Sequence, residues 1–140
     1  MTGEGSLVEK VSADSNAGGG MVVAGTVIQS SATQNGAAGI FAITVRDSTA
    51  VQNLGDGILL DGSGGVATGN IASFNGKHGI LAPNGTVTNN TVVRNMSFGI
   101  SSLCPSVIVG NTVVSNAGGS IETTGSEVCA VSNNATRPQL

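Results

Sequence analysis

The feature of this sequence that most limits its fold is a motif, Asn-x-x-x-Gly-Ile, that recurs six times along the chain. The Asn-to-Gly spacing is four in every copy, and successive asparagines are separated by 19, 18, 22, 20 and 21 positions. The last copy has Ser in place of Gly, and the first has Met in place of Ile. The motif asparagines are Asn16, Asn35, Asn53, Asn75, Asn95 and Asn116. A repeat of about 20 residues is typical of a solenoid, in which each repeat forms one coil.

Three short β-prone runs make up each repeat, and Gly or Asn separates them. Residues 107–116, for example, read Val-Ile-Val-Gly-Asn-Thr-Val-Val-Ser-Asn. Strands this short are unstable alone, but they pair with the same strand of the next coil when coils stack about 4.8 Å apart. We therefore predict an all-β fold, a parallel β-helix of about six to seven coils with three short strands per coil.

The motif residues have separate structural roles in such a stack. The asparagines are expected to form a ladder, in which each side-chain amide bonds to the Asn one coil above and below. Gly and Asn also tolerate the left-handed backbone conformation that sharp corners need. The residue after each motif glycine is expected to point inward and to stack on its copies, from Met21 to Ile121.

The segment Gly110-Asn111-Thr-Val-Val-Ser-Asn116 is similar to the Gly-Asn-Thr-Val-x-x-Asn segment of one group of short repeat proteins. Together with the Asn-x-x-x-Gly-Ile copies, it makes the chain resemble the right-handed parallel β-helix (pectate-lyase-like) superfamily over roughly residues 7–134. The resemblance implies a right-handed helix. It leaves the activity open, because the superfamily includes polysaccharide lyases, glycoside hydrolases, alginate epimerases, phage tailspikes and adhesins, and because the motif residues are structural.

The ends of the repeat set the expected domain boundaries. We predict a single β-helix domain over residues 1–140, with the repeat core at 7–134 and a tail at 135–140, where Pro138 prevents strand continuation. No helical cap is predicted at either end, and uncapped ends expose pairing edges. Either the chain is a fragment of a longer protein, or its ends self-associate.

Charged residues are sparse, with 5 basic and 8 acidic side chains and a formal net charge of −3. Nucleic acid is not an expected partner, because binding it needs a basic stripe. Membrane insertion is not expected either, because no run approaches the roughly 18 apolar residues of a membrane span. The fold type favours a secreted or cell-surface protein, although residues 1–6 lack the features of a signal peptide.

The two cysteines are Cys104 and Cys129. Aligning residues 107–111 with residues 129–133 places Cys129 directly over Val107, and Cys104 lies three residues before Val107 on the neighbouring coil. The pair is therefore within expected disulfide reach, and such a disulfide would fasten the last coil. The alternative is two free, buried thiols that act as small hydrophobic side chains.

One corner of the predicted stack holds residues that can carry chemistry. Asp56 and His78 each stand three positions after a ladder asparagine on adjacent coils, and Lys77 precedes His78. An Asp–His contact can serve in proton transfer, so the three residues are ligand-binding candidates. The alternative is a solvated corner with a surface ion pair. No catalytic residue is assigned, and neither a metal nor a cofactor is expected from one His, two Cys and scattered acids.

Three functions remain open. The preferred hypothesis is a non-catalytic secreted or surface module that acts as a scaffold, an adhesin segment or a weak glycan binder, because the chain has no evident carboxylate cluster. The second is a small or truncated polysaccharide-active enzyme, a lyase, hydrolase or epimerase, which the superfamily favours. The third is a self-assembling structural unit. The expected partners are accordingly a polysaccharide or further copies of the chain.

Overall fold

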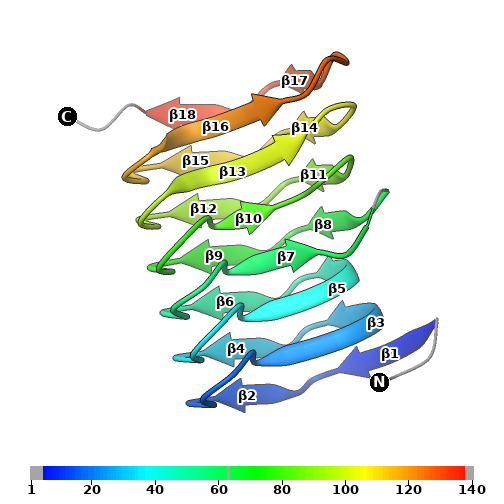
Figure 1. Cartoon of the computed structure of the whole chain (residues 1–140), viewed down its shortest axis with the longest axis vertical. Coiled ribbons are helices and arrows are strands. Elements are labelled where there is room, and N and C mark those ends of the chain that lie inside the picture. The colour runs from blue at the N-terminus through cyan, green and yellow to red at the C-terminus, as the bar shows by residue number, and fades with distance from the viewer. Residues whose placement is uncertain (1–4, 63, 138–140) are drawn as a thin grey trace.

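The computed structural model describes residues 5–62 and 64–137, in which the regular elements are all β-strands (Figure 1). The coils stack along one axis, and every strand is parallel to its partner in the next coil. Over these residues the stack has about seven coils with three faces, so the prediction of an all-β parallel solenoid is confirmed. Within the same residues, no helix has the length and apolar character to cross a membrane.

The strands that follow the motif glycines form the front face, towards the viewer in Figure 1. They are β3 (Met21–Ile28), β5 (Ile40–Arg46), β7 (Ile58–Leu60), β10 (Ile80–Leu81), β13 (Phe98–Leu103) and β16 (Gly119–Thr124). The second face comprises β1 (Ser6–Glu9), β8 (Val66–Thr68), β11 (Thr86–Thr88), β14 (Val107–Val109), β17 (Ala130–Ser132) and the distal halves of β3 and β5. The third face comprises β2 (Ser12–Asp14), β4 (Ser31–Thr33), β6 (Thr49–Val51), β9 (Ile71–Ser73), β12 (Thr91–Val93), β15 (Thr112–Val114) and β18 (Ala135–Arg137).

Two coils depart from the expected three short strands. In β3 and β5, the front-face and second-face strands run on as one strand. These coils also have the shortest repeats, with 19 and 18 residues between ladder asparagines. A short coil leaves no residues for a loop between the two faces, so the strand continues around the edge with only a register shift between Val23 and Thr26.

The core is the predicted stack of aliphatic side chains. Ile40, Ile58, Ile80 and Ile100 are fully buried, while Met21 and Ile121 end the stack. Small and β-branched residues from the other two faces fill the remaining space. No aromatic side chain of the described residues belongs to this core, which is consistent with the scarcity of aromatics in the chain.

Two polar ladders run along the corners on either side of the third face. The first is the predicted asparagine ladder: Asn53 Nδ2 donates to Asn75 Oδ1 (3.0 Å), and Asn75 Nδ2 donates to Asn95 Oδ1 (2.9 Å). The same bond joins each of the six motif asparagines to the next, which confirms the prediction. The second ladder lies between the second and third faces and consists of Ser30, Ser48, Asn70, Asn90, Asn111 and Asn134.

The expectation that Gly and Asn take the left-handed corner conformation is correct only in part. The ladder asparagines do not adopt it; the residue before each ladder position does. Gln52 (φ 56°), Phe74 (φ 56°) and Arg94 (φ 57°) are examples at the first ladder, where no such position holds Asn or Gly. At the second ladder, Asn or Gly occupies four of the six positions: Gly69, Asn89, Gly110 and Asn133. A non-glycine residue costs about 1–2 kcal/mol in this conformation, and the ladder bonds on either side hold it in place.

Close packing, rather than backbone conformation, explains the motif glycines. A Cβ at Gly79 would overlap Val92 Cγ1 and would lie 2.7 Å from both Asn95 Nδ2 and the carbonyl oxygen of Gly99. Gly57 meets the equivalent atoms of the next coil. β16 is the last front-face strand of the described residues, so no further coil packs against Ser120. The sixth copy of the motif therefore accommodates Ser in place of Gly.

We expect Gly79→Ala to lower the free energy of unfolding by about 3 kcal/mol, because the added methyl displaces both Val92 and the ladder amide. Gly18 provides a matched control, since it lies in the same type of turn and a Cβ there meets open space. Gly18→Ala should leave stability unchanged or raise it by up to about 1 kcal/mol. Urea unfolding followed by circular dichroism measures both; equal midpoints would contradict the packing role.

Two expectations about the last coil are wrong. The tail predicted at 135–140 begins too early, because Ala135–Arg137 forms β18 and Ala135 N donates to the oxygen of Asn111 (2.8 Å); Pro138 lies outside the described residues. Ala130, not Cys129, lies over Val107. The cause of both is that Asn134, not Asn133, occupies the ladder, where it accepts a bond from Asn111 N (2.9 Å).

A disulfide joins Cys104 to Cys129 across neighbouring coils, with a Cα–Cα distance of 5.0 Å. The one-residue change in register leaves the pair within reach, because Cys129 now stands just before the strand that stacks on β14. The loop between β16 and β17 is thereby tied to the loop between β13 and β14.

Candidate binding site

The predicted cluster lies at the corner where the third face turns into the front face. Asp56 Oδ1 accepts a hydrogen bond from the backbone N–H of His78 (3.0 Å) and lies 2.8 Å from His78 Nδ1. Asp56 is buried, and the His78 side chain is 23% exposed. In the tautomer with its proton on Nδ1, the imidazole donates to this carboxylate and leaves Nε2 as an acceptor.

The ladder explains why these two residues meet. Asn53 and Asn75 are stacked, and the turns that follow them have the same length, so residues three positions further along also stack. Gly57 N donates to the oxygen of His78 (2.9 Å), which fixes the two turns against each other. The contact inferred from the repeat register is therefore present.

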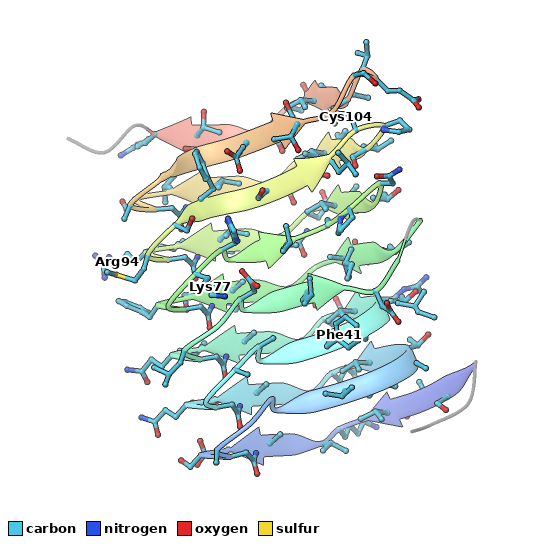
Figure 2. The ribbon with its side chains drawn as sticks, in the orientation of Figure 1. Phe41, Lys77, Arg94 and Cys104 are labelled. Atoms are coloured by element: carbon cyan, nitrogen blue, oxygen red, sulfur yellow. A yellow bond between two sulfur atoms is a disulfide. The ribbon has the colours of Figure 1, made fainter. Side chains whose placement is uncertain are left out.

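Lys77 is exposed at the same corner, and Figure 2 shows it to the right of Arg94, in front of the ribbon. Among the residues that the structure describes, the ion pairs are His78–Asp56 and Lys10–Glu9, so the ammonium of Lys77 has no carboxylate partner. The corner thus holds one engaged acid and one cation that faces solvent.

Sequence reasoning did not connect a second group at this corner. The guanidinium of Arg94 lies over the Phe74 ring, 5.6 Å from its centroid, which is a cation–π geometry. Phe74 is 50% exposed, and Leu54 and Met96 on the flanking coils are 72% and 70% exposed. The signal was available in the register, because Phe74 and Arg94 each stand directly before a ladder asparagine.

We call Leu54, Phe74, Lys77, Arg94 and Met96 the corner cluster. Its apolar side chains are exposed on three successive coils, and its two cations, Lys77 and Arg94, come from adjacent coils on this side of the molecule (Figure 2). Exposed apolar surface beside unpaired cations suits an anionic ligand that also has apolar faces. In the described part of the chain, no group of three or more His, Cys, Asp or Glu side chains could hold a metal ion.

The outward row of the front face borders this corner and is also apolar. Phe41, Leu59 and Leu81 stack in register on β5, β7 and β10. The row becomes polar at β13, where Ser101 Oγ donates to Glu122 Oε2 on the next coil (2.9 Å). A ligand that extends from the corner cluster onto the front face would therefore meet an apolar surface.

The model of the family described as right handed beta helix region matches residues 1–136. The chain belongs to the right-handed β-helix family. No curated protein matches this β-helix. The A-module of mannuronan C-5 epimerase AlgE6 from Azotobacter vinelandii is similar in structure, with a TM-score of 0.67 and 24% sequence identity over 80% of this chain and 35% of that one.

The A-module of mannuronan C-5 epimerase AlgE4 from the same organism has a TM-score of 0.60 and 18% identity, over 80% of this β-helix and 42% of that module. The chain therefore spans less than half of either module. At these identities the similarity is one of fold, and the chemistry has to be argued from the residues at the corner.

Proposed function

We propose that this β-helix binds an acidic polysaccharide at the corner cluster and does not cleave it. The observation that carries the proposal is the Arg94–Phe74 pair beside the unpaired ammonium of Lys77. An aromatic ring offers a surface for the apolar face of a sugar, while guanidinium and ammonium groups bind carboxylates. The similarity to mannuronan C-5 epimerase modules supports a polysaccharide as the ligand class.

The layout of the cluster favours a polymer over a single sugar. Leu54, Phe74 and Met96 lie on three successive coils, which are spaced by about 4.8 Å. A chain that runs along the helix axis would contact all three side chains at once. Each contact is weak, and the affinity comes from their number.

The first test is calorimetric titration with mannuronan oligosaccharides. We expect Arg94→Gln and Phe74→Gln each to weaken binding about tenfold, equivalent to about 1.4 kcal/mol, and we expect affinity to fall with salt. Both variants should fold, because Gln34 and Gln52 occupy the same corner position in other coils.

Arg46→Gln is the matched control, since it removes the same charge from an exposed position on the second face. An equal loss with Arg46→Gln would mean that only net charge matters. Equal binding of a neutral glucan would contradict the assignment of an acidic ligand.

A polysaccharide-modifying enzyme is the second candidate, favoured by the Asp56–His78 contact beside the apolar row of the front face. Asp56 would orient the imidazole, and Nε2 would take a proton from the substrate. The test incubates the protein with mannuronan and polygalacturonate and follows epimerised and unsaturated units by NMR. Turnover that disappears in His78→Ala would replace the binding proposal with a catalytic one.

The remaining hypotheses predict different results in the same experiments. A pure scaffold would bind none of the polysaccharides, and a self-assembling unit would show a mass that rises with concentration in light scattering. Action outside the cell, which a polysaccharide ligand favours, stays a prediction.

A further inference from the structure

The front face of the β-helix carries neither lysine nor arginine. The chain has 5 basic residues, and all of them are among the described residues. Lys77 and Arg94 belong to the corner cluster, while Lys10, Arg46 and Arg137 lie on the second or third face or at the corner between them. An acidic ligand on this side of the molecule is therefore attracted only at the corner cluster.

Two carboxylates border the apolar row of the front face. Glu122 continues the row by register, because it pairs with Ser101, which pairs with Leu81. Asp61 is exposed two positions after Leu59, so it points outward on the same side of the sheet, and its backbone N–H continues the pairing with β5. Neither carboxylate forms an ion pair within the described part of the chain. The row thus has negative charge at one end and along one side.

The same row lies where a ligand longer than the corner cluster continues. The cluster spans three successive coils, which is about 10 Å along the axis, so a longer polysaccharide extends beyond it. Lys77 stands in the turn that leads into β10, four positions before Leu81. A chain that is bound at Lys77 and turns onto the front face therefore passes over Leu81 and then over Leu59.

The charges around the row determine which sugars can lie there. A uronate on the two leucines would lose water from its carboxylate without gaining a cation, and Asp61 and Glu122 would repel it. A neutral sugar has neither penalty, and its apolar face can pack on the leucines and on Phe41, which stands on the same face (Figure 2). An unfavourable charge placed against one class of ligand is a source of specificity.

We infer that this site prefers an acidic polysaccharide in which uncharged sugar residues adjoin the charged ones. The charged residue binds at Lys77 and Arg94, and its uncharged neighbours lie on the apolar row of the front face. Asp61 and Glu122 are the specificity-determining residues, because they act against a further carboxylate. The inference rests on the binding proposed for the corner cluster, and it adds that a fully charged polymer is not the best ligand.

The test is calorimetric titration with hexasaccharides that differ only in charge. The probes are mannuronan, the same oligosaccharide with about half of its carboxyl groups reduced to primary alcohols, and the fully reduced, neutral form. We expect the partly reduced form to bind about threefold more tightly than mannuronan, the size of effect found between exposed charges, and the neutral form to bind most weakly. Equal binding of the two charged forms would overturn the inference alone. Binding of neither would reject the corner proposal, and the inference with it.

Asp61→Asn/Glu122→Gln tests the residues assigned to this preference. The double variant should bind mannuronan about threefold more tightly than the wild type does, and as tightly as it binds the partly reduced form. Both substitutions should preserve the fold, because Asp61 is exposed and a glutamine at position 122 still accepts the hydrogen bond from Ser101. Unchanged affinity for mannuronan would contradict the inference.

Asp14→Asn/Glu127→Gln is the matched control. It removes the same charge from exposed positions away from the apolar row, one in β2 on the third face and one in the loop after β16. This variant should keep the wild-type preference for the partly reduced form. An equal gain in its affinity for mannuronan would mean that net charge alone decides, and would overturn the inference.

Discussion

Asn75→Ala is expected to lower the free energy of unfolding by about 4 kcal/mol. Asn75 Nδ2 donates to the oxygen of Ala50 (3.0 Å) and to Asn95 Oδ1 (2.9 Å), while its Oδ1 accepts from the backbone and side-chain nitrogens of Asn53 (3.1 and 3.0 Å). The side chain is fully buried. Its removal leaves several buried polar groups unpaired, and each costs about 1–3 kcal/mol when no water reaches it.

Urea unfolding measures this loss, and Asn89→Ala is its control. Asn89 is exposed and stands outside the ladder, so the same substitution should cost only about 1 kcal/mol, chiefly because alanine is less favourable at φ 55°. Similar losses for the two variants would show that the ladder contributes little to stability. A solenoid unfolds with neighbouring coils coupled, so we expect a single broadened transition rather than separate ones.

Loss of the disulfide is expected to free the last coil. By the chain-entropy relation, a cross-link between residues 25 apart contributes about 3.5 kcal/mol. β17 and β18 are exposed along their length, so few buried contacts hold them once the link between Cys104 and Cys129 is gone. Cys104→Ala/Cys129→Ala should therefore destabilise this end far more than the middle of the stack.

Native-state hydrogen exchange resolves the effect by position. We expect amides of β17 and β18 to exchange up to about 300-fold faster in the double variant, the factor that corresponds to about 3.5 kcal/mol, while β6 and β9 keep their protection. The reduced wild-type protein should give the same pattern. Uniform loss of protection along the chain, or none at all, would contradict this local role.

Much of the architecture follows from the repeat alone. A fixed spacing from Asn to Gly places Ile40 over Ile58 and Asp56 beside His78, because stacked turns of equal length bring equivalent positions together. The first ladder and the inward row were predictable for the same reason. The second ladder was harder to predict in the early coils, because Ser30 and Ser48 replace its asparagines there and serine is common throughout the chain.

Other features depend on how loops and corners pack. Two consecutive asparagines, Asn133 and Asn134, left the register of the last coil ambiguous, and only the hydrogen bond to Asn111 decided it. Phe74 and Arg94 both have a left-handed backbone conformation, which is unfavourable for either residue type. The stacking of the Arg94 side chain on the Phe74 ring depends on that conformation.

By itself, the sequence determined the length of each coil, the residues that lie over one another on adjacent coils, and the residues of the core. This is because backbone pairing between coils is periodic and the motif carries the period. Only the tertiary structure decided how the Arg94 side chain stacks on Phe74 and how the loops between the front and second faces pack. Those loops hold the residues by which coils of 18 to 22 residues differ, and their path is set by packing rather than by the repeat.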